Sequence, residues 1–185
     1  MRRVDSIMQR VYEERKQSRR VTAWKGNCVK TVIVYNSVFG NTEQIARHIA
    51  DAIPGTVKLV KVGKASPQEI SGADMLVVGS PTVGGRATRP MQEFLDNLPK
   101  GIVGKVSLAA FDTRISMKFA QIFGYAAPCM AEALKQKGCA VKLPPEGFIV
   151  KRRNGPLADG ELERASAWGK TVSRGASRRM GPPGE

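Results

Sequence analysis

The first segment with the residue types of a binding site is "NSVFGNT", residues 36–42, which directly follows a run of strand-forming residues. Gly40 allows a tight turn, and Ser37 and Thr42 offer hydroxyl groups. Because a helical pattern begins immediately afterwards, the free N–H groups of its first turn would attract an anion. The segment has no lysine and no P-loop pattern, which argues against a nucleoside triphosphate. Two interpretations remain, a cradle for a small terminal phosphate or a turn that only caps a helix.

Two further segments have unusual loop compositions, "SPTVGGRAT" at residues 80–88 and "DTRISMK" at residues 112–118. Each comes at the end of a segment that reads as a buried strand. Ligands of open parallel sheets bind beyond the carboxyl ends of the strands, where the connections reverse direction. We therefore expect these two loops and residues 36–42 to surround one site.

The elements that must position these loops follow from alternating strand and helix patterns. Strands are expected at residues 30–35, 57–62, 73–81 and 105–113, and a fifth, interrupted strand region at residues 140–150. The unbroken apolar run in the third strand indicates burial on both faces. Helices are expected at residues 43–53, after a cap at Thr88 with Pro90 in the first turn, at residues 128–137, and from about residue 159. This order predicts a three-layer, doubly wound α/β domain with a five-stranded parallel sheet.

The formal net charge is +14, and the two ends of the chain are more basic per residue than its middle. Residues 1–28 hold eight Lys/Arg against three acidic residues, and the apolar spacing from Val4 to Val11 predicts an extra amphipathic N-terminal helix. Residues 174–185 are rich in Gly, Pro, Ser and Arg and are expected to form a disordered basic tail. The folded domain is thus predicted at residues 29–173. Contact of the basic ends with nucleic acid or an anionic membrane is an alternative to a solvated helix packed on its own domain.

Other features of the sequence exclude whole classes of function. No apolar run approaches the roughly 20 residues that span a bilayer. The three cysteines form no CxxC pair, and they favour a reducing cytoplasm over a disulfide scaffold. The single histidine, His48, leaves no Ser-His-Asp triad or multi-histidine metal site to assemble.

The combination of loops resembles the flavodoxin-like FMN proteins in their short form, over about residues 29–173. "NSVFGNTEQIA" looks like the flavodoxin phosphate loop, and "VVGSPTVGGRATRPMQEFL" looks like the stretch after the third strand in many flavodoxin-domain proteins. "AAFDTR" and "PPEGFIVKRRNGPLADGELERASAWGK" are similar to the end of the fourth strand and the C-terminal third of the same group. The resemblance implies a flavodoxin-like fold with strand order 2-1-3-4-5.

The resemblance also implies the cofactor FMN and the residues that bind it. The phosphate would lie on the first loop, at Ser37, Val38, Phe39, Gly40, Asn41 and Thr42. The isoalloxazine ring would lie between the third-strand loop (Ser80, Pro81, Thr82, Val83, Gly84, Gly85 and Arg86) and the fourth-strand loop, which begins with Asp112, Thr113 and Arg114.

Two features of the ring loops depart from the pattern of the family. Val83 stands where flavodoxins often carry an aromatic residue that stacks on the flavin. The loss of this stacking lowers the binding free energy by about 1 kcal/mol beyond the contribution of simple burial. The loops are also basic, with Arg86, Arg89, Arg114 and Lys118 in or beside them, whereas flavodoxin electron carriers are typically acidic. A nearby cation favours an anionic reduced flavin and raises its potential.

The implied function is that of an FMN-binding redox protein in electron transfer, with a redox partner protein. The first alternative is an NAD(P)H-dependent flavin or quinone reductase, because hydride transfer from a nicotinamide needs no acid or base side chain. The second is a flavodoxin-like binding module that has lost its flavin, which Val83 favours. The basic ring loops suit anionic NADPH as well as an acidic partner protein, and the missing acid and base side chains favour the carrier.

Overall fold

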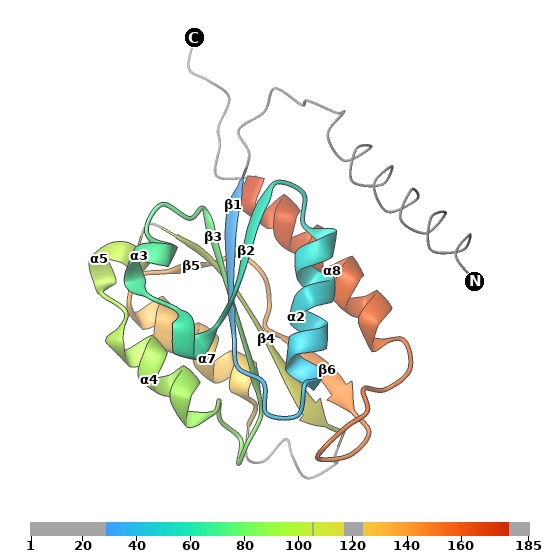
Figure 1. The fold of residues 1–185 in the computed structure, drawn as a ribbon. Helices are drawn as coiled ribbons and strands as arrows, with labels where there is room; N and C mark the ends of the chain where they lie inside the picture. The colour runs from blue at the N-terminus through green and yellow to red at the C-terminus, as the bar shows by residue number, and fades with distance from the viewer. Residues whose placement is uncertain (1–28, 105, 117–123, 178–185) are drawn as a thin grey trace, which may run out of the picture.

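The chain folds around one parallel β-sheet (Figure 1). The structure is a computed structural model that describes residues 29–104, 106–116 and 124–177. The predicted N-terminal helix, most of the predicted basic tail and Lys118 lie outside these ranges. The strands are β1 (Lys30–Tyr35), β2 (Thr56–Lys61), β3 (Met75–Pro81), β4 (Ser107–Ile115), β5 (Ala140–Val141) and β6 (Glu146–Val150). Their pairings are all parallel, in the order β2-β1-β3-β4-β5 with β6 also on β4, which confirms the predicted topology.

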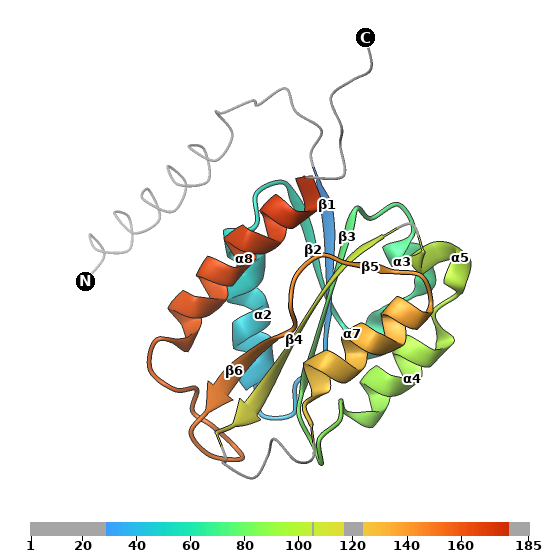
Figure 2. The same ribbon diagram turned by 180° about the vertical axis from the view of Figure 1, so that it is seen from behind.

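Helices cover both faces of the sheet (Figures 1 and 2). One face carries α2 (Asn41–Ala52) and α8 (Glu161–Ser177), and the other carries α4 (Arg89–Asn97) and α7 (Ala126–Gln136). Three short elements, η1 (Val62–Lys64), α3 (Pro67–Ile70) and α5 (Lys100–Val103), lie on the second side and were not expected from the sequence. The two layers make this a three-layer α/β fold. No helix in the described part of the chain is long and apolar enough to cross a membrane.

The core forms because the central strands are apolar on both faces. Side chains that alternate along β1 and β3 enter opposite layers: Val34 and Val78 pack under α4 and α7, whereas Ile33 and Val77 pack under α2 and α8. All four are fully buried. Burial of such side chains stabilises the fold by roughly 1.5–3 kcal/mol each. The sheet is therefore a rigid platform for the loops at its carboxyl edge.

The helices α2 and α8 approach each other closely at Gly169. A Cβ atom placed on this glycine would lie 2.7 Å from the carbonyl oxygen of Ile49 in α2. A larger residue would therefore force the two helices apart. On the same face of the sheet, the rings of Phe111, Phe148 and Trp168 meet edge to face, with centroids 6.0–6.3 Å apart.

The observed boundaries differ from the predicted ones at three helices. α2 begins at Asn41, two residues before the predicted start, because its first turn follows directly on Gly40, and it ends at Ala52. α7 begins at Ala126, two residues before the predicted start, because side chains from other elements cap its first turn. α8 begins near the predicted position but continues to Ser177, so residues 174–177, expected to start the disordered tail, form its last turn. The fifth strand region is interrupted as predicted, since Pro144 and Pro145 have no N–H to donate between β5 and β6.

Candidate cofactor site

A cavity of about 480 Å³ opens where β1, β3, β4 and β6 end. Its wall comes from all three predicted loops and from the connection between β6 and α8. The lining residues are Val38, Phe39, Asn41, Thr42, Pro81, Thr82, Val83, Gly84, Thr113, Arg114, Ile115, Val150 and Arg153. The three loops therefore do meet at one site, as the sequence predicts.

The loop before α2 has the geometry of an anion cradle. Gly40 has φ of 87° and is the N-cap of α2, and within the described ranges no side chain accepts a hydrogen bond from the first turn of this helix. The N–H groups of the first turn are therefore left without a side-chain acceptor. The hydroxyl oxygen of Ser37 is buried and has no hydrogen-bond partner among the described residues. A buried hydroxyl and an uncapped helix start are donors that a phosphate would satisfy, so the loop fits a phosphate group.

Two buried hydroxyls form the floor between the loops. Oγ1 of Thr42, in the first turn of α2, lies 2.8 Å from Oγ1 of Thr113 at the end of β4. Only one of the two hydroxyls can donate in this pair, so the other keeps a hydrogen for a further acceptor. The pair fixes the α2 terminus against the end of β4.

The loop after β3 ends in a tight hairpin turn at residues 83–86. Val83 and Arg86 exchange both backbone hydrogen bonds, at 2.8 and 3.1 Å. Gly84 and Gly85 both have positive φ, 56° and 80°, as a type I′ turn requires. Ser80 anchors the base of the loop by accepting a hydrogen bond from the N–H of Thr88 at 3.0 Å. The turn holds Val83 at the mouth of the cavity, with 59% of its surface exposed.

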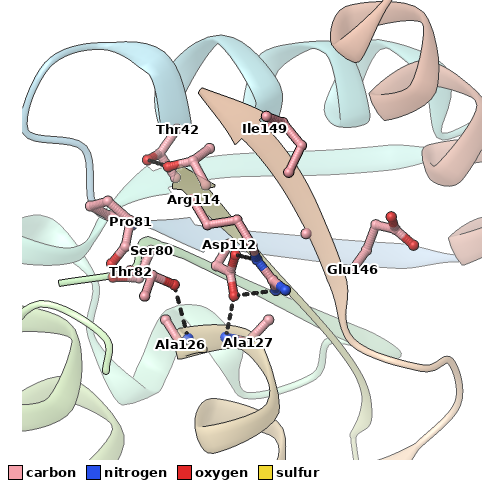
Figure 3. A network of polar contacts seen from close by, with 12 residues as sticks. Thr42, Ser80, Pro81, Thr82, Asp112, Arg114, Ala126, Ala127, Glu146 and Ile149 are labelled. Carbon is pink, nitrogen blue, oxygen red and sulfur yellow. Dashed lines mark hydrogen bonds and ion pairs between the residues drawn. The ribbon is translucent and has the colours of Figure 1, made fainter. Parts of the chain in front are cut away.

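The end of β4 and the start of α7 are joined by a polar network (Figure 3). The carboxylate of Asp112 is fully buried and accepts hydrogen bonds from Nε and Nη2 of Arg114 at 2.5 and 2.6 Å, and from the N–H of Ala127 at 2.8 Å. The hydroxyl of Thr82 accepts a bond from the N–H of Ala126 at 3.0 Å. Asp112 and Thr82 thus cap α7 from two different loops of the site.

Burial is the strongest influence on Asp112 and raises its pKa, although the Arg114 guanidinium and the Ala127 N–H act in the opposite direction. The same guanidinium lies 3.6 Å from the ring centroid of Tyr125, and a Cβ atom at Gly147 would clash with it. Arg114 is therefore clamped from several sides, and its position at the cavity wall is fixed.

The predicted site residues divide into two groups. Ten of the sixteen line the cavity, namely Val38, Phe39, Asn41, Thr42, Pro81, Thr82, Val83, Gly84, Thr113 and Arg114. The other six, Ser37, Gly40, Ser80, Gly85, Arg86 and Asp112, are not on its wall. Asp112 lies behind the wall with its oxygens occupied, and Ser80 braces the loop. Both act on the site by positioning its loops.

Two lining residues, Val150 and Arg153, were missed from the sequence, and a third, Ile115, lies in the predicted loop at residues 112–118 but was not named as a site residue. Ile115 follows Arg114 in β4 and pairs with Val150 at the end of β6. The sequence signal that was available for Arg153 is its place just after the last strand, where ligand-binding loops of such sheets begin.

The comparison with known sequences decides the family. Residues 32–133 match the family described as "Flavodoxin domain". The chain belongs to this family. Flavodoxin-family proteins bind FMN, so it is an FMN-binding, flavodoxin-like protein of an electron-transfer family.

Individual relatives agree with this assignment. The chain is 30% identical over 100 residues to a flavodoxin of Aquifex aeolicus (strain VF5). The matched segment covers 52% of this chain and 51% of that flavodoxin. It is 36% identical over 91 residues to the "Putative diflavin flavoprotein A 5" of a Nostoc species, covering 45% of this chain and 15% of the relative. The matched segment thus spans about half the length of the curated flavodoxin.

Solved structures have the same fold. A flavodoxin from the domain Archaea superposes with a TM-score of 0.65 at 23% identity, covering 80% of this chain and 99% of the other. The rubredoxin oxygen:oxidoreductase of Desulfovibrio gigas superposes with a TM-score of 0.64 at 25% identity, covering 81% of this chain but only 36% of the other.

Proposed function

We propose that this flavodoxin-like chain is an electron carrier that binds FMN in the 480 Å³ cavity and exchanges electrons with a partner protein. The chemistry that bound FMN supplies is reversible uptake and release of electrons at its isoalloxazine ring. Ser37 and the start of α2 would hold the phosphate, and the loops that end in Gly84 and Arg114 would hold the ring.

One observation supports a carrier over an enzyme that uses acid–base catalysis. Among the residues that line the cavity, the ionisable side chains are Arg114 and Arg153, neither of which gives up a proton at ordinary pH. The nearby carboxylate of Asp112 is buried and engaged by Arg114 and Ala127. The part of the wall that the structure describes thus provides no general acid or base for a substrate. Electron exchange needs only that the redox group lie near the surface.

The surface around the cavity suits an acidic partner. Val38, Phe39 and Val83 are 50–59% exposed at its mouth. Arg86, Arg152 and Arg153 are also exposed, and none of them forms an ion pair with a carboxylate of the described residues. An apolar centre with a polar rim is the usual arrangement of a protein interface, and charge that is complementary between the partners speeds association. The partner would therefore carry carboxylates around its own redox centre.

The proposal is tested by two separate assays, one for the electron donor and one for the electron acceptor. The FMN-loaded protein is mixed without oxygen with NADPH or NADH, and its visible absorbance is followed. For a carrier we expect no bleaching beyond the rate of free FMN. Rapid bleaching by the nicotinamide alone would instead place the protein among the NAD(P)H-dependent reductases.

The acceptor side is tested with two probes of opposite charge. The dithionite-reduced protein is mixed with native cytochrome c, which is basic, or with cytochrome c whose lysines are succinylated, which is acidic and has the same haem as the electron acceptor. We expect faster oxidation by the acidic probe, with a rate that falls as salt is added. Equal rates without salt dependence would contradict an electrostatic docking surface.

A further inference from the structure

Arg153 reaches the cavity from a part of the chain far from the other phosphate-site residues. It lies in the connection between β6 and α8, more than 100 residues after Thr42, and lines the same cavity as Asn41 and Thr42. The loop before α2 carries no cation of its own, so any positive side chain at this end must come from elsewhere in the fold.

The backbone of the β6–α8 connection packs directly on the start of α2. Gly155 has φ of 110°, and a Cβ atom there would lie 2.8 Å from Oδ1 of Asn41. Two backbone hydrogen bonds close this loop, from the N–H of Lys151 to the carbonyl of Pro156 at 2.9 Å and from Gly155 to Arg152 at 3.0 Å. The loop is thus fixed next to Asn41, at the end of the cavity where the phosphate is proposed to bind.

The guanidinium of Arg153 is available to a ligand. Lys151 on the same loop pairs with Asp159 at 2.8 Å, and Arg114 across the cavity pairs with Asp112. Arg153 is exposed, and no carboxylate of the described residues lies within ion-pair distance of it. Arg152, its neighbour, is equally exposed and unpaired within the described ranges but does not line the cavity.

We infer that Arg153 binds the cofactor phosphate across the cavity from the α2 terminus and thereby makes the site selective for phosphorylated flavin. The inference rests on the proposed binding of FMN. The helix terminus offers about half a positive charge, whereas a phosphate monoester carries nearly two negative charges near neutral pH. A guanidinium supplies the missing charge, and its fork of donors matches two phosphate oxygens at once.

The test compares FMN with riboflavin, which differs from it only by the phosphate. Dissociation constants for both flavins are measured by fluorescence quenching with the full-length apoprotein and the variants Arg153→Gln, Arg153→Lys and Arg152→Gln, at low and high salt. We expect Arg153→Gln to reduce the preference for FMN over riboflavin about tenfold, which corresponds to about 1.4 kcal/mol, and to flatten its salt dependence. Arg153→Lys should keep part of the preference, and Arg152→Gln should keep all of it.

The outcomes separate the two proposals. FMN binding by the wild type together with an unchanged preference in Arg153→Gln would overturn the role of Arg153 alone. An equal loss of preference in Arg152→Gln would also overturn it, because the effect would then be one of general surface charge. Failure of the wild type to bind FMN would overturn the proposed function itself.

Discussion

Asp112 and Arg114, two residues apart on β4, form a doubly hydrogen-bonded ion pair in which the carboxylate is fully buried and the guanidinium side chain 16% exposed. The pair does two things at once, since Asp112 caps α7 while Arg114 forms part of the cavity wall. Loss of this pair should therefore lower the stability of the fold and also disturb the wall of the cavity.

Replacing Asp112 with Asn should cost about 3 kcal/mol in free energy of unfolding, because it leaves the Arg114 charge without its partner in a largely dehydrated place. Urea unfolding followed by circular dichroism measures the loss. The matched control is Asp159→Asn, which removes the partner of Lys151 where the carboxylate side chain is 95% exposed and should change the stability little. Equal effects of the two substitutions would contradict a structural role for the buried pair.

Cys139 should give the protein a distinctive loss of stability at alkaline pH. Burial raises the pKa of its thiol from 9.0 to about 11. Between these values the unfolded chain releases the thiol proton while the folded chain keeps it, so stability falls as pH rises. One such proton contributes a slope of about 1.4 kcal/mol per pH unit.

Unfolding midpoints of the reduced protein from pH 8 to 11 test this expectation. Cys139→Ala should lower stability throughout, because it removes buried volume, but should flatten the alkaline slope. Cys129→Ala, at an exposed position, is the control and should leave the slope as it is. If the midpoints of Cys139→Ala fall with pH as steeply as those of the wild type, this thiol is not the cause of the alkaline loss of stability.

Gly169→Ala should destabilise the protein although alanine is the better helix former. The added Cβ would meet the Ile49 carbonyl oxygen at 2.7 Å, and we expect a loss of about 1–3 kcal/mol from overpacking. Gly175→Ala in the same helix is the matched control. There the nearest atom would be Cβ of Lys142 at 3.6 Å, an ordinary contact, and we expect a gain of about 0.5–1 kcal/mol from helix propensity. Thermal unfolding of both variants should shift in opposite directions.

Val83→Trp should tighten FMN binding about fivefold, because an aromatic ring at the cavity mouth can stack on the isoalloxazine for about 1 kcal/mol. The turn tolerates the change, since Val83 is mostly exposed and its backbone is held by Arg86. Flavin titration measures the gain, and Val141→Trp on β5, outside the cavity, is the control. Unchanged affinity would show that the ring does not lie against residue 83.

The sequence predicts those parts of the fold that local patterns determine. The apolar runs locate β1, β3 and β4, and the Thr88–Pro90 signal locates the start of α4 correctly. The start of α7 is missed because its capping groups, Thr82 and Asp112, come from residues at least 14 positions earlier in the chain. Arg153 follows the last strand, which was a usable signal, but the contact between Gly155 and Asn41 that fixes its loop beside α2 joins residues far apart in the chain and is not visible in a local pattern.

The interrupted strand has a consequence for how the molecule behaves in a crowded solution. β5 has two residues and β6 five, and the Pro144–Pro145 pair between them offers no donor to an incoming strand. At the opposite edge, β2 carries Lys58 and Lys61. Short strands, proline and lysine at an edge are known barriers to pairing between chains. Both edges of the sheet are therefore poor templates for pairing with a strand of another chain. The folded protein can thus stay monodisperse even though the apolar mouth of its cavity is exposed for a partner.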